Sequence, residues 1–444
     1  MTAEERARGA SPFALDRPIE ALVATNVPFW RLERGSHRRI EAMLRSLATF
    51  GVRWSLAYVA DEPFPDDFAR FGIVEARRLP HTPGRTPRGL SGLLSKHWKG
   101  TANALSVAAA KIRGSNASRA GSASKKLADF YSGEAVEALA EWMNEKRFHG
   151  ALVEYVHLAY LQQANALLSP KRRPTWLIDT HDVMWQRAER HAHAGAAHWL
   201  SIDSEEESNA LMPFDASLAI QPVERETLQA MLPGRRVLLA PHAVDLPTVE
   251  EESTPALPAR FDASRPLSIG FIGSGGAMNF DSAKVLLEEI WPRIEAARGD
   301  AVRLVLAGEA TEGYRESHRS PRILFLGRVA NLGEFYSRID VSANPVRYGA
   351  GLKIKNVEAL AYGKGLVTTT VGAAGMEAGS GTAFVIDDEP ARFADAIIAW
   401  SNDPASLQEF ARRGRDFARK TFSPEAAYDE VLSLLREAAK RERG

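Results

Sequence analysis

The sequence contains no cysteine among its 444 residues, and this absence removes several kinds of chemistry at once. Disulfide bonds, thiolate zinc sites, iron–sulfur clusters and cysteine nucleophiles are all excluded. The chain also has no net charge, since 56 Lys and Arg balance 56 Asp and Glu. A neutral chain argues against a surface built as a whole for nucleic acid. No apolar run approaches the roughly 20 residues of a membrane-spanning helix, so we expect a cytoplasmic protein.

The residues that are present have the composition of an ordinary globular protein, 45% hydrophobic and 25% charged. At roughly 150 residues per domain, the length predicts two or three domains. Residues 1–18 are polar with no apolar segment behind them, and we interpret them as a flexible leader rather than a signal peptide. Residues 421–444 are expected to form a C-terminal helix.

Two parts of the chain alternate apolar stretches of strand length with amphipathic stretches of helix length. In the first part the predicted strands are 19–24, 54–59, 151–157, 175–179, 217–220 and 237–240, with a helix at 36–50. In the second part they are 267–272, 302–307, 323–326, 340–344, 366–370 and 384–386. Strands that are short and almost wholly apolar are typical of buried parallel sheets.

A stretch rich in Pro and Glu, residues 246–266, separates the two alternating parts. It has no periodicity, and we interpret it as a linker. The sequence therefore predicts an α/β protein with two doubly wound Rossmann-like domains, residues 19–245 and 267–420.

Residues 81–127 depart from the alternation because their charged side chains are all positive. They contain no Asp or Glu and nine Lys or Arg: Arg85, Arg88, Lys96, Lys99, Lys111, Arg113, Arg119, Lys125 and Lys126. Apolar residues between 90 and 98 fall at helical spacing, which is typical of an element lying on an anionic membrane surface. A solvated insertion rich in Ser, Gly and Ala is an equally good interpretation.

The strongest chemical signal lies in residues 344–376. A predicted strand ends at Asn344, a loop carrying Gly349 and Gly351 follows, and a helix begins near Ile354. Glycines allow the backbone amides at a helix start to approach an anion closely. The segment therefore predicts a site for a phosphate group.

Charged side chains around this helix start complete the pattern. Arg347, Lys353 and Lys355 can neutralise a phosphate, and Glu358, about one helical turn inside, can accept hydrogen bonds from a ribose diol. The alternative is that these are ordinary surface charges at the start of a helix. The order of glycines, cations and Glu358 favours the binding site.

The segment from Arg347 to Gly375 resembles the donor-binding motif of the retaining group 1 glycosyltransferases with the GT-B fold. The shared pattern is R-x-G-x-G-x-x-x-K-x-x-E-A-x-A-x-G-K, which runs here from Arg347 to Lys364. Loops at 35–36, 180–182, 241–245 and 272–273 follow in the order of that family. The resemblance implies two domains that face each other across a cleft.

The resemblance also implies a function: transfer of a sugar from a nucleotide diphosphate sugar to a glycan, lipid-linked or other hydroxyl acceptor. Glu358 would contact the ribose, the amides of Gly351, Leu352 and Lys353 the diphosphate, and loop 328–332 the base. The loop of Gly35 and Ser36 would close on the same phosphates, although Gly35 is also explained as a turn glycine. The resemblance further implies that the product retains the anomeric configuration of the donor sugar. It also implies a hexosyltransferase that takes part in polysaccharide biosynthesis.

Two departures from the family pattern affect the expected site. The acidic residue that commonly lies eight positions before the ribose-binding Glu is Ala350 here. Residues 273–281 also lack the Arg and Lys that often hold the diphosphate, so Arg347 and Lys353 are the expected substitutes. No Asp-x-Asp occurs, and we therefore expect neither a metal nor a cofactor beyond the sugar nucleotide.

Two histidines of the first domain follow predicted strands, where ligands bind in open α/β sheets. His157 and His181 could bind the transferred sugar or orient the acceptor hydroxyl, or each could be a buried structural histidine. The candidate catalytic residues are thus His157, His181, Arg347 and Lys353. The candidate donor-binding residues are Gly35, Ser36, Arg347, Gly349, Gly351, Leu352, Lys353, Lys355 and Glu358.

Two other functions fit the same fold. A nucleotide-sugar isomerase or epimerase would need acid and base carboxylates in the cleft and no acceptor site. A non-catalytic homologue would bind a nucleotide without turnover, and Ala350 supports that reading. The partners expected from the main hypothesis are a sugar-nucleotide donor, a glycan or lipid-linked acceptor, and an anionic membrane at its inner face, but no nucleic acid.

Overall fold

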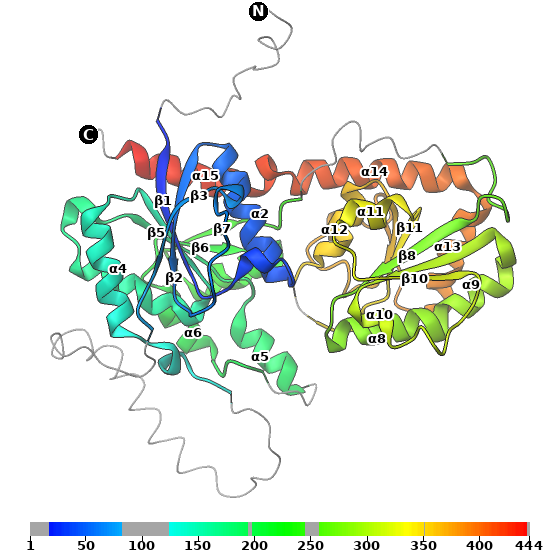
Figure 1. The fold of residues 1–444 in the computed structure, drawn as a ribbon, viewed down its shortest axis with the longest axis horizontal. Coiled ribbons are helices and arrows are strands. Elements are labelled where there is room, and N and C mark those ends of the chain that lie inside the picture. Colours follow the sequence, from blue (N-terminus) through cyan, green and yellow to red (C-terminus); the bar gives the residue numbers. More distant parts are fainter. Residues whose placement is uncertain (1–16, 82–123, 194–197, 245–256, 350, 442–444) are drawn as a thin grey trace, which may run out of the picture.

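A computed structural model describes residues 17–81, 124–193, 198–244, 257–349 and 351–441. These residues form two α/β domains, one after the other along the chain (Figure 1). Most of the predicted leader, residues 82–123 of the basic segment, residues 245–256 of the linker, and Ala350 lie outside the described residues.

The described part of the first domain contains a sheet of seven parallel strands in the order β3-β2-β1-β4-β5-β6-β7. Its strands are β1 (Ile19–Thr25), β2 (Val52–Tyr58), β3 (Ile73–Arg78), β4 (Gly150–Glu154), β5 (Thr175–Asp179), β6 (Ala216–Ala219) and β7 (Arg236–Leu239). Its main helices are α2 (Gly35–Thr49), α4 (Gly133–Glu145), α5 (Met184–His193), α6 (Ser204–Leu211) and α7 (Pro222–Met231).

The second domain has, among the described residues, six parallel strands in the order β10-β9-β8-β11-β12-β13. They are β8 (Leu267–Ile272), β9 (Val302–Ala307), β10 (Ile323–Gly327), β11 (Val341–Asn344), β12 (Gly365–Thr368) and β13 (Val385–Ile386). The helices are α8 (Ala277–Val285), α9 (Trp291–Arg298), α10 (Glu309–Glu312), α11 (Leu332–Ser337), α12 (Ile354–Ala361), α13 (Pro390–Asn402), α14 (Pro404–Phe422) and α15 (Pro424–Lys440).

Both faces of the first sheet are buried, because alternate residues of each strand point to opposite sides. In β1, Leu22 and Ala24 enter one apolar cluster while Ala21 and Val23 enter another. Helix α2 covers the second cluster with apolar residues at spacings of three and four, as the sequence predicts. The prediction of two Rossmann-like α/β domains is confirmed.

Helix α15 returns from the second domain and completes the core of the first (Figure 1). Tyr428, Val431 and Leu435 lie in the same apolar cluster as α2, and the Tyr428 hydroxyl accepts a hydrogen bond from the Ala243 amide at 3.3 Å. The chain therefore crosses between the domains twice, once through the linker and once at the junction of α14 and α15.

In the first domain one local prediction is wrong and one strand was missed. The predicted strand 151–157 ends at Glu154, because Tyr155 has a φ of 71° and a long 3-10 helix, η4 (Val156–Leu167), follows. Strand β3 was not predicted, since its edge position allows three charged residues in the sequence I-V-E-A-R-R. Among the helices of the described residues, none is long and apolar enough to span a membrane.

Candidate active site

The starts of two helices, one from each domain, face each other across the domain junction. Helix α2 begins at Gly35 and helix α12 at Ile354. A methyl group placed on Gly35 would lie 3.5 Å from Cδ1 of Ile354. Each helix start offers backbone amides and a partial positive charge, so the junction between them favours an anion.

The loop before α12 has the glycine-dependent backbone that the sequence predicts. Gly349 and Gly351 have φ values of 114° and 74°, which favour glycine over other residues. Side-chain hydrogen bonds fix the first turn of α12 to neighbouring loops. Asn344 donates to Asn356 at 2.9 Å, and Asn356 donates to the Gly372 carbonyl at 2.8 Å. The start of α12 is therefore fixed to the ends of β11 and β12.

Of the two lysines at this helix start, Lys353 is buried and Lys355 is partly buried. The Lys353 ammonium donates to the Gly351 carbonyl at 2.7 Å, and that of Lys355 donates to Oδ1 of Asn279 at 2.7 Å. Lys355 also lies 4.7 Å from the ring centre of Phe271. Burial lowers the pKa of Lys353 to about 8 and that of Lys355 to about 7. A phosphate entering the site would therefore restore charge to these ammonium groups.

Glu358 lies one turn further along α12, where charges from both domains act on it. Burial raises the pKa of its carboxyl to about 7, against the opposing influence of Arg38 and Lys355. The Tyr336 hydroxyl donates to the Lys355 carbonyl at 3.1 Å, and its presence near Glu358 favours the ionised carboxylate. The carboxyl is thus partly desolvated before any ligand arrives.

Arg38 and Arg347 differ in where their charges lie. Arg38, on α2 of the first domain, acts electrostatically on Glu358 across the junction. Arg347 is half-exposed and pairs with Asp281 of α8, with one contact of 3.0 Å from Nε to Oδ2. The charge of Arg347 is therefore paired with Asp281. The arginine whose charge acts on Glu358 is Arg38. The sequence analysis did not single out Arg38.

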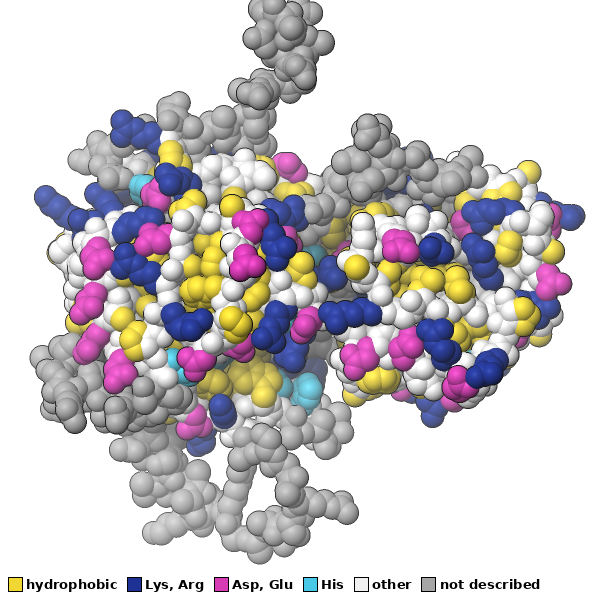
Figure 2. Space-filling view, in the orientation of Figure 1, with side chains coloured by type: hydrophobic (Ala, Val, Ile, Leu, Met, Phe, Trp, Pro, Cys, Tyr) yellow, Lys and Arg dark blue, Asp and Glu magenta, His cyan; other side chains and the backbone are white. Residues whose placement is uncertain are grey.

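The loop after β5 meets the loop before α12. A methyl group placed on Gly351 would lie 3.7 Å from Oδ1 of Asp182, which is buried with no hydrogen-bond partner among the described residues. Nearby, Leu352 packs in an apolar cluster with Ile220 of the first domain. Figure 2 shows Lys, Arg and His side chains on the visible surface where the two lobes meet. The predicted donor loop therefore faces the first domain directly.

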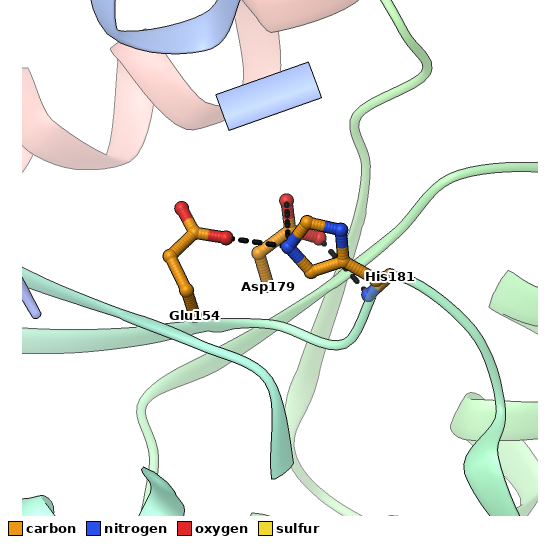
Figure 3. Close-up of side chains that lie close together, drawn as sticks. All are labelled: Glu154, Asp179 and His181. Carbon is orange, nitrogen blue, oxygen red and sulfur yellow. Dashed lines mark hydrogen bonds and ion pairs between the residues drawn. The ribbon is translucent and has the colours of Figure 1, made fainter. Parts of the chain in front are cut away.

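His181 is held by three residues of the first domain, of which Figure 3 shows Glu154 and Asp179. Its Nε2 lies 2.6 Å from Oε2 of Glu154, and its backbone amide donates to Oδ1 of Asp179 at 3.3 Å. The Tyr155 ring stacks on the imidazole with centres 3.8 Å apart, and the Tyr155 hydroxyl forms a hydrogen bond with Ser36. His181 and Tyr155 both have positive φ values, a backbone strain that often marks functional sites.

Arg39 of α2 completes this buried cluster. Its guanidinium forms two hydrogen bonds of 2.8 Å with the Asp179 carboxylate, and both side chains are at most 2% exposed. Burial raises the pKa of Asp179, but the charge and hydrogen bonds of Arg39 outweigh it and hold the pKa below its usual value. Oxygens of Glu154 and Asp179 and a nitrogen of His181 lie within 4.8 Å of one another, close enough for metal ligands. Because Arg39 occupies both oxygens of Asp179, this arrangement does not favour a cation.

His157 does not share this arrangement. It lies in η4 beyond the end of β4, its Nε2 is 3.1 Å from Oδ1 of Asn26, and burial lowers its pKa to about 3. An imidazole that stays neutral and is enclosed beside Phe130 fits a structural histidine. Of the two candidate histidines, the geometry favours His181 as the functional one.

Residues 266–403 match the family model described as glycosyl transferases group 1. The lipopolysaccharide core biosynthesis mannosyltransferase LpsB of Rhizobium meliloti is 30% identical over 138 residues, 29% of this chain and 39% of that protein. An uncharacterized 44.6 kDa protein in the cps region of Klebsiella pneumoniae is 25% identical over 155 residues, 33% of this chain and 40% of that protein. The aligned part thus spans about 40% of the length of these curated relatives.

Solved structures are similar over nearly the whole chain. Sucrose-phosphate synthase from Thermosynechococcus elongatus has a TM-score of 0.62 and 17% identity, covering 96% of this chain and 100% of that one. HepE of Anabaena, in complex with UDP and glucose, has a TM-score of 0.60 and 12% identity, covering 94% and 100%. At these identities the likeness concerns the fold, two parallel-sheet domains in the same order.

Proposed function

We propose that this chain, a GT-B-fold relative of the group 1 glycosyltransferases, transfers a sugar from a nucleotide diphosphate sugar to a hydroxyl acceptor. The observation that carries the proposal is the start of α12, where buried Lys353 and partly buried Lys355 and Glu358 lie opposite the start of α2. Two helix starts and two ammonium groups suit a diphosphate, and a desolvated carboxylate suits a ribose diol.

The proposed chemistry relies on positioning and charge. As the glycosidic bond breaks, negative charge develops on the departing phosphate, and Lys353 and Lys355 stabilise it. We propose that the acceptor attacks from the face that the phosphate leaves, so that the departing oxygen helps to remove the acceptor proton and the configuration is retained. In this reaction the two ammonium groups replace a metal, which is why we expect activity in the presence of a chelator.

The first test is binding. Nucleoside diphosphates with different bases should raise the melting temperature of the full chain, since a ligand that binds only the folded state stabilises it. HepE was solved with UDP, so UDP is the natural starting point. If none of UDP, GDP, dTDP and ADP stabilises the protein, the nucleotide site is refuted.

The second test is turnover. Release of the nucleoside diphosphate from a matching sugar nucleotide, dependent on added glycan or lipid-linked acceptors, would support transfer. NMR of the anomeric proton would then test retention. Conversion of the donor sugar without an acceptor would indicate an isomerase or epimerase instead. Binding without any conversion would indicate a non-catalytic homologue.

We propose that residues 81–127, which are nearly all outside the described residues, help to bring the protein to its acceptor. Their nine positive charges without a negative one favour contact with an anionic membrane that carries a lipid-linked acceptor. The protein should sediment with anionic vesicles at low salt, less at high salt, and poorly with neutral vesicles. Unchanged sedimentation after deletion of residues 85–126 from a folded protein would contradict this role.

A further inference from the structure

The buried cluster around His181 has an unbalanced charge. Two carboxylates, Glu154 and Asp179, face one guanidinium, that of Arg39, and both carboxylates are fully buried. With both carboxyls ionised and the imidazole neutral, one negative charge would remain without compensation. An isolated charge of this kind is costly in a low-dielectric interior.

Other polar groups near the cluster do not supply the missing positive charge. The groups that act on it include Tyr155 after β4, His157 in η4 and Tyr428 on α15. Burial keeps His157 neutral and raises the pKa of both tyrosines, so that these hydroxyls remain protonated. Burial lowers the pKa of His242 to about 3 and raises that of Glu224 to about 8, so both are mostly uncharged near neutral pH. Arg187 is paired with Asp182 at 2.8 Å. Oε1 of Glu154 has no hydrogen-bond partner among the described residues. A proton on the Glu154–His181 pair is then the simplest way to neutralise the cluster.

We propose that Glu154 is a positioning residue that keeps a proton on Nδ1 of His181, so that His181 presents a hydrogen-bond donor to the reacting sugar or acceptor. The proposal rests on the proposed transferase function. The extra proton can be placed in two ways, on an imidazolium beside an ionised Glu154 or on a neutral Glu154 that donates to Nε2. In both cases Nδ1 carries a hydrogen.

The geometry places Nδ1 away from the two carboxylates. Glu154 and Asp179 both lie on the Nε2 side of the ring, and Nδ1 lies on the other side (Figure 3). The loop that carries His181 continues into Asp182, which approaches Gly351 of the donor loop. Stacked Tyr155 and the 2.6 Å contact with Glu154 prevent the ring from turning over. Burial also raises the pKa of the Glu154 carboxyl, in keeping with a retained proton.

The experiment measures the hydrogen on Nδ1 directly. In the full-length protein with 15N-labelled histidine, the His181 signals are those lost in a His181→Asn variant. Near neutral pH we expect Nδ1 to be protonated in the parent. In Glu154→Met, the acidic group nearest Nε2 is Asp179 at 3.8 Å, which favours the proton on Nε2 and leaves Nδ1 bare. A bare Nδ1 in the parent, or a protonated Nδ1 in the Met variant, overturns the proposal.

Kinetics provide the second readout. Glu154→Met should lower kcat roughly 10- to 100-fold with little change in the donor KM, since a donor aimed at the reacting groups is lost. Glu154→Gln should restore part of kcat, because its amide can donate to Nε2 and leave the proton on Nδ1. Glu207→Gln is the matched control, since Glu207 is an equally buried carboxyl that binds the Met184 and Trp185 amides instead. Equal kcat in the parent and both Glu154 variants would overturn the role.

The two proposals fail in different ways. If the parent has the expected proton on Nδ1 but transfers no sugar from any donor, the transferase function is wrong and the assignment of the proton to the pair stands. If transfer occurs and Nδ1 is bare, the function stands and the role of Glu154 is wrong. If the Met variant does not fold, the nitrogen shifts of the parent and the Gln variant still decide.

Discussion

Replacing Glu358 by Gln tests the ribose site most directly, because the two side chains have nearly the same shape. An ionised carboxylate that accepts hydrogen bonds contributes about 1.5–3 kcal/mol, and a neutral amide about 0.5–1.5 kcal/mol. The expected loss is therefore about 1–2 kcal/mol, or roughly 5- to 30-fold in the dissociation constant of a nucleoside diphosphate. The loss should depend on the ribose 2′-hydroxyl.

The pH dependence of this effect has a definite sign. Burial raises the pKa of Glu358 to about 7 in the free protein, so the carboxyl is mostly protonated at lower pH and ionised at higher pH. The parent should therefore prefer a ribonucleotide over its 2′-deoxy analogue increasingly as the pH rises through 7. The Gln variant should show a preference that does not change with pH.

Isothermal titration calorimetry with both nucleotides at several pH values measures this preference. Both nucleotides carry the same phosphates and contact Lys355 in the same way. The ratio of their affinities therefore removes these contributions. The control is Glu334→Gln, which changes an exposed carboxylate on α11 that pairs with Arg338. Equal losses for the ribonucleotide and the deoxynucleotide would refute the role of Glu358 in binding ribose.

Three further predictions concern the charged side chains. Lys353→Ala should weaken nucleoside diphosphate binding more than Arg347→Ala, because Arg347 is half-exposed and already paired with Asp281. If calorimetry shows the opposite order, the proposed phosphate site at Lys353 is wrong. Binding should make Lys355 take up a proton near neutral pH, because a phosphate raises its lowered pKa, while ionisation of Glu358 releases one. Titrations in buffers of different ionisation enthalpy measure the net proton change, which Lys355→Met should shift toward release. Arg39→Met should lower the free energy of unfolding by about 3–5 kcal/mol, because it leaves Asp179 buried without its partner. Denaturant unfolding measures this loss, and the control Arg412→Met, which removes an exposed ion pair, should change the free energy little.

The sequence predicted most of the fold because buried parallel strands are so uniform in composition. Strand β5 has the predicted bounds, and helix α2 begins one residue earlier than predicted. Strand β3 could not be recognised, since it lies at the edge of the sheet and its second half, residues 75–78, is mostly charged. The place of α15 could not be predicted either, because an amphipathic pattern shows that a face is buried but not which domain covers it.

The parts of the site that lie in one segment were easier to predict than those assembled from several. Gly351, Lys353 and Glu358 share one loop and helix, so their order in the sequence already suggested their proximity. The cluster of Arg39, Glu154 and Asp179 draws on three distant segments. A signal for it was present, since Glu154 and Asp179 each place a charge at the end of a wholly apolar strand. Such a charge needs a partner, but the sequence does not say which one.

The position of Arg38 connects the charge of the ribose site to the arrangement of the two domains. Glu358 belongs to the second domain, and Arg38 of the first domain favours its ionised form. If the domains separated, that influence would weaken and the carboxyl would hold its proton to higher pH. A nucleotide that binds best to the ionised carboxylate must then, by linkage, favour the arrangement in which Arg38 is close. Donor binding and approach of the acceptor domain would thus be coupled through a single carboxylate, with no change in the start of α12 itself.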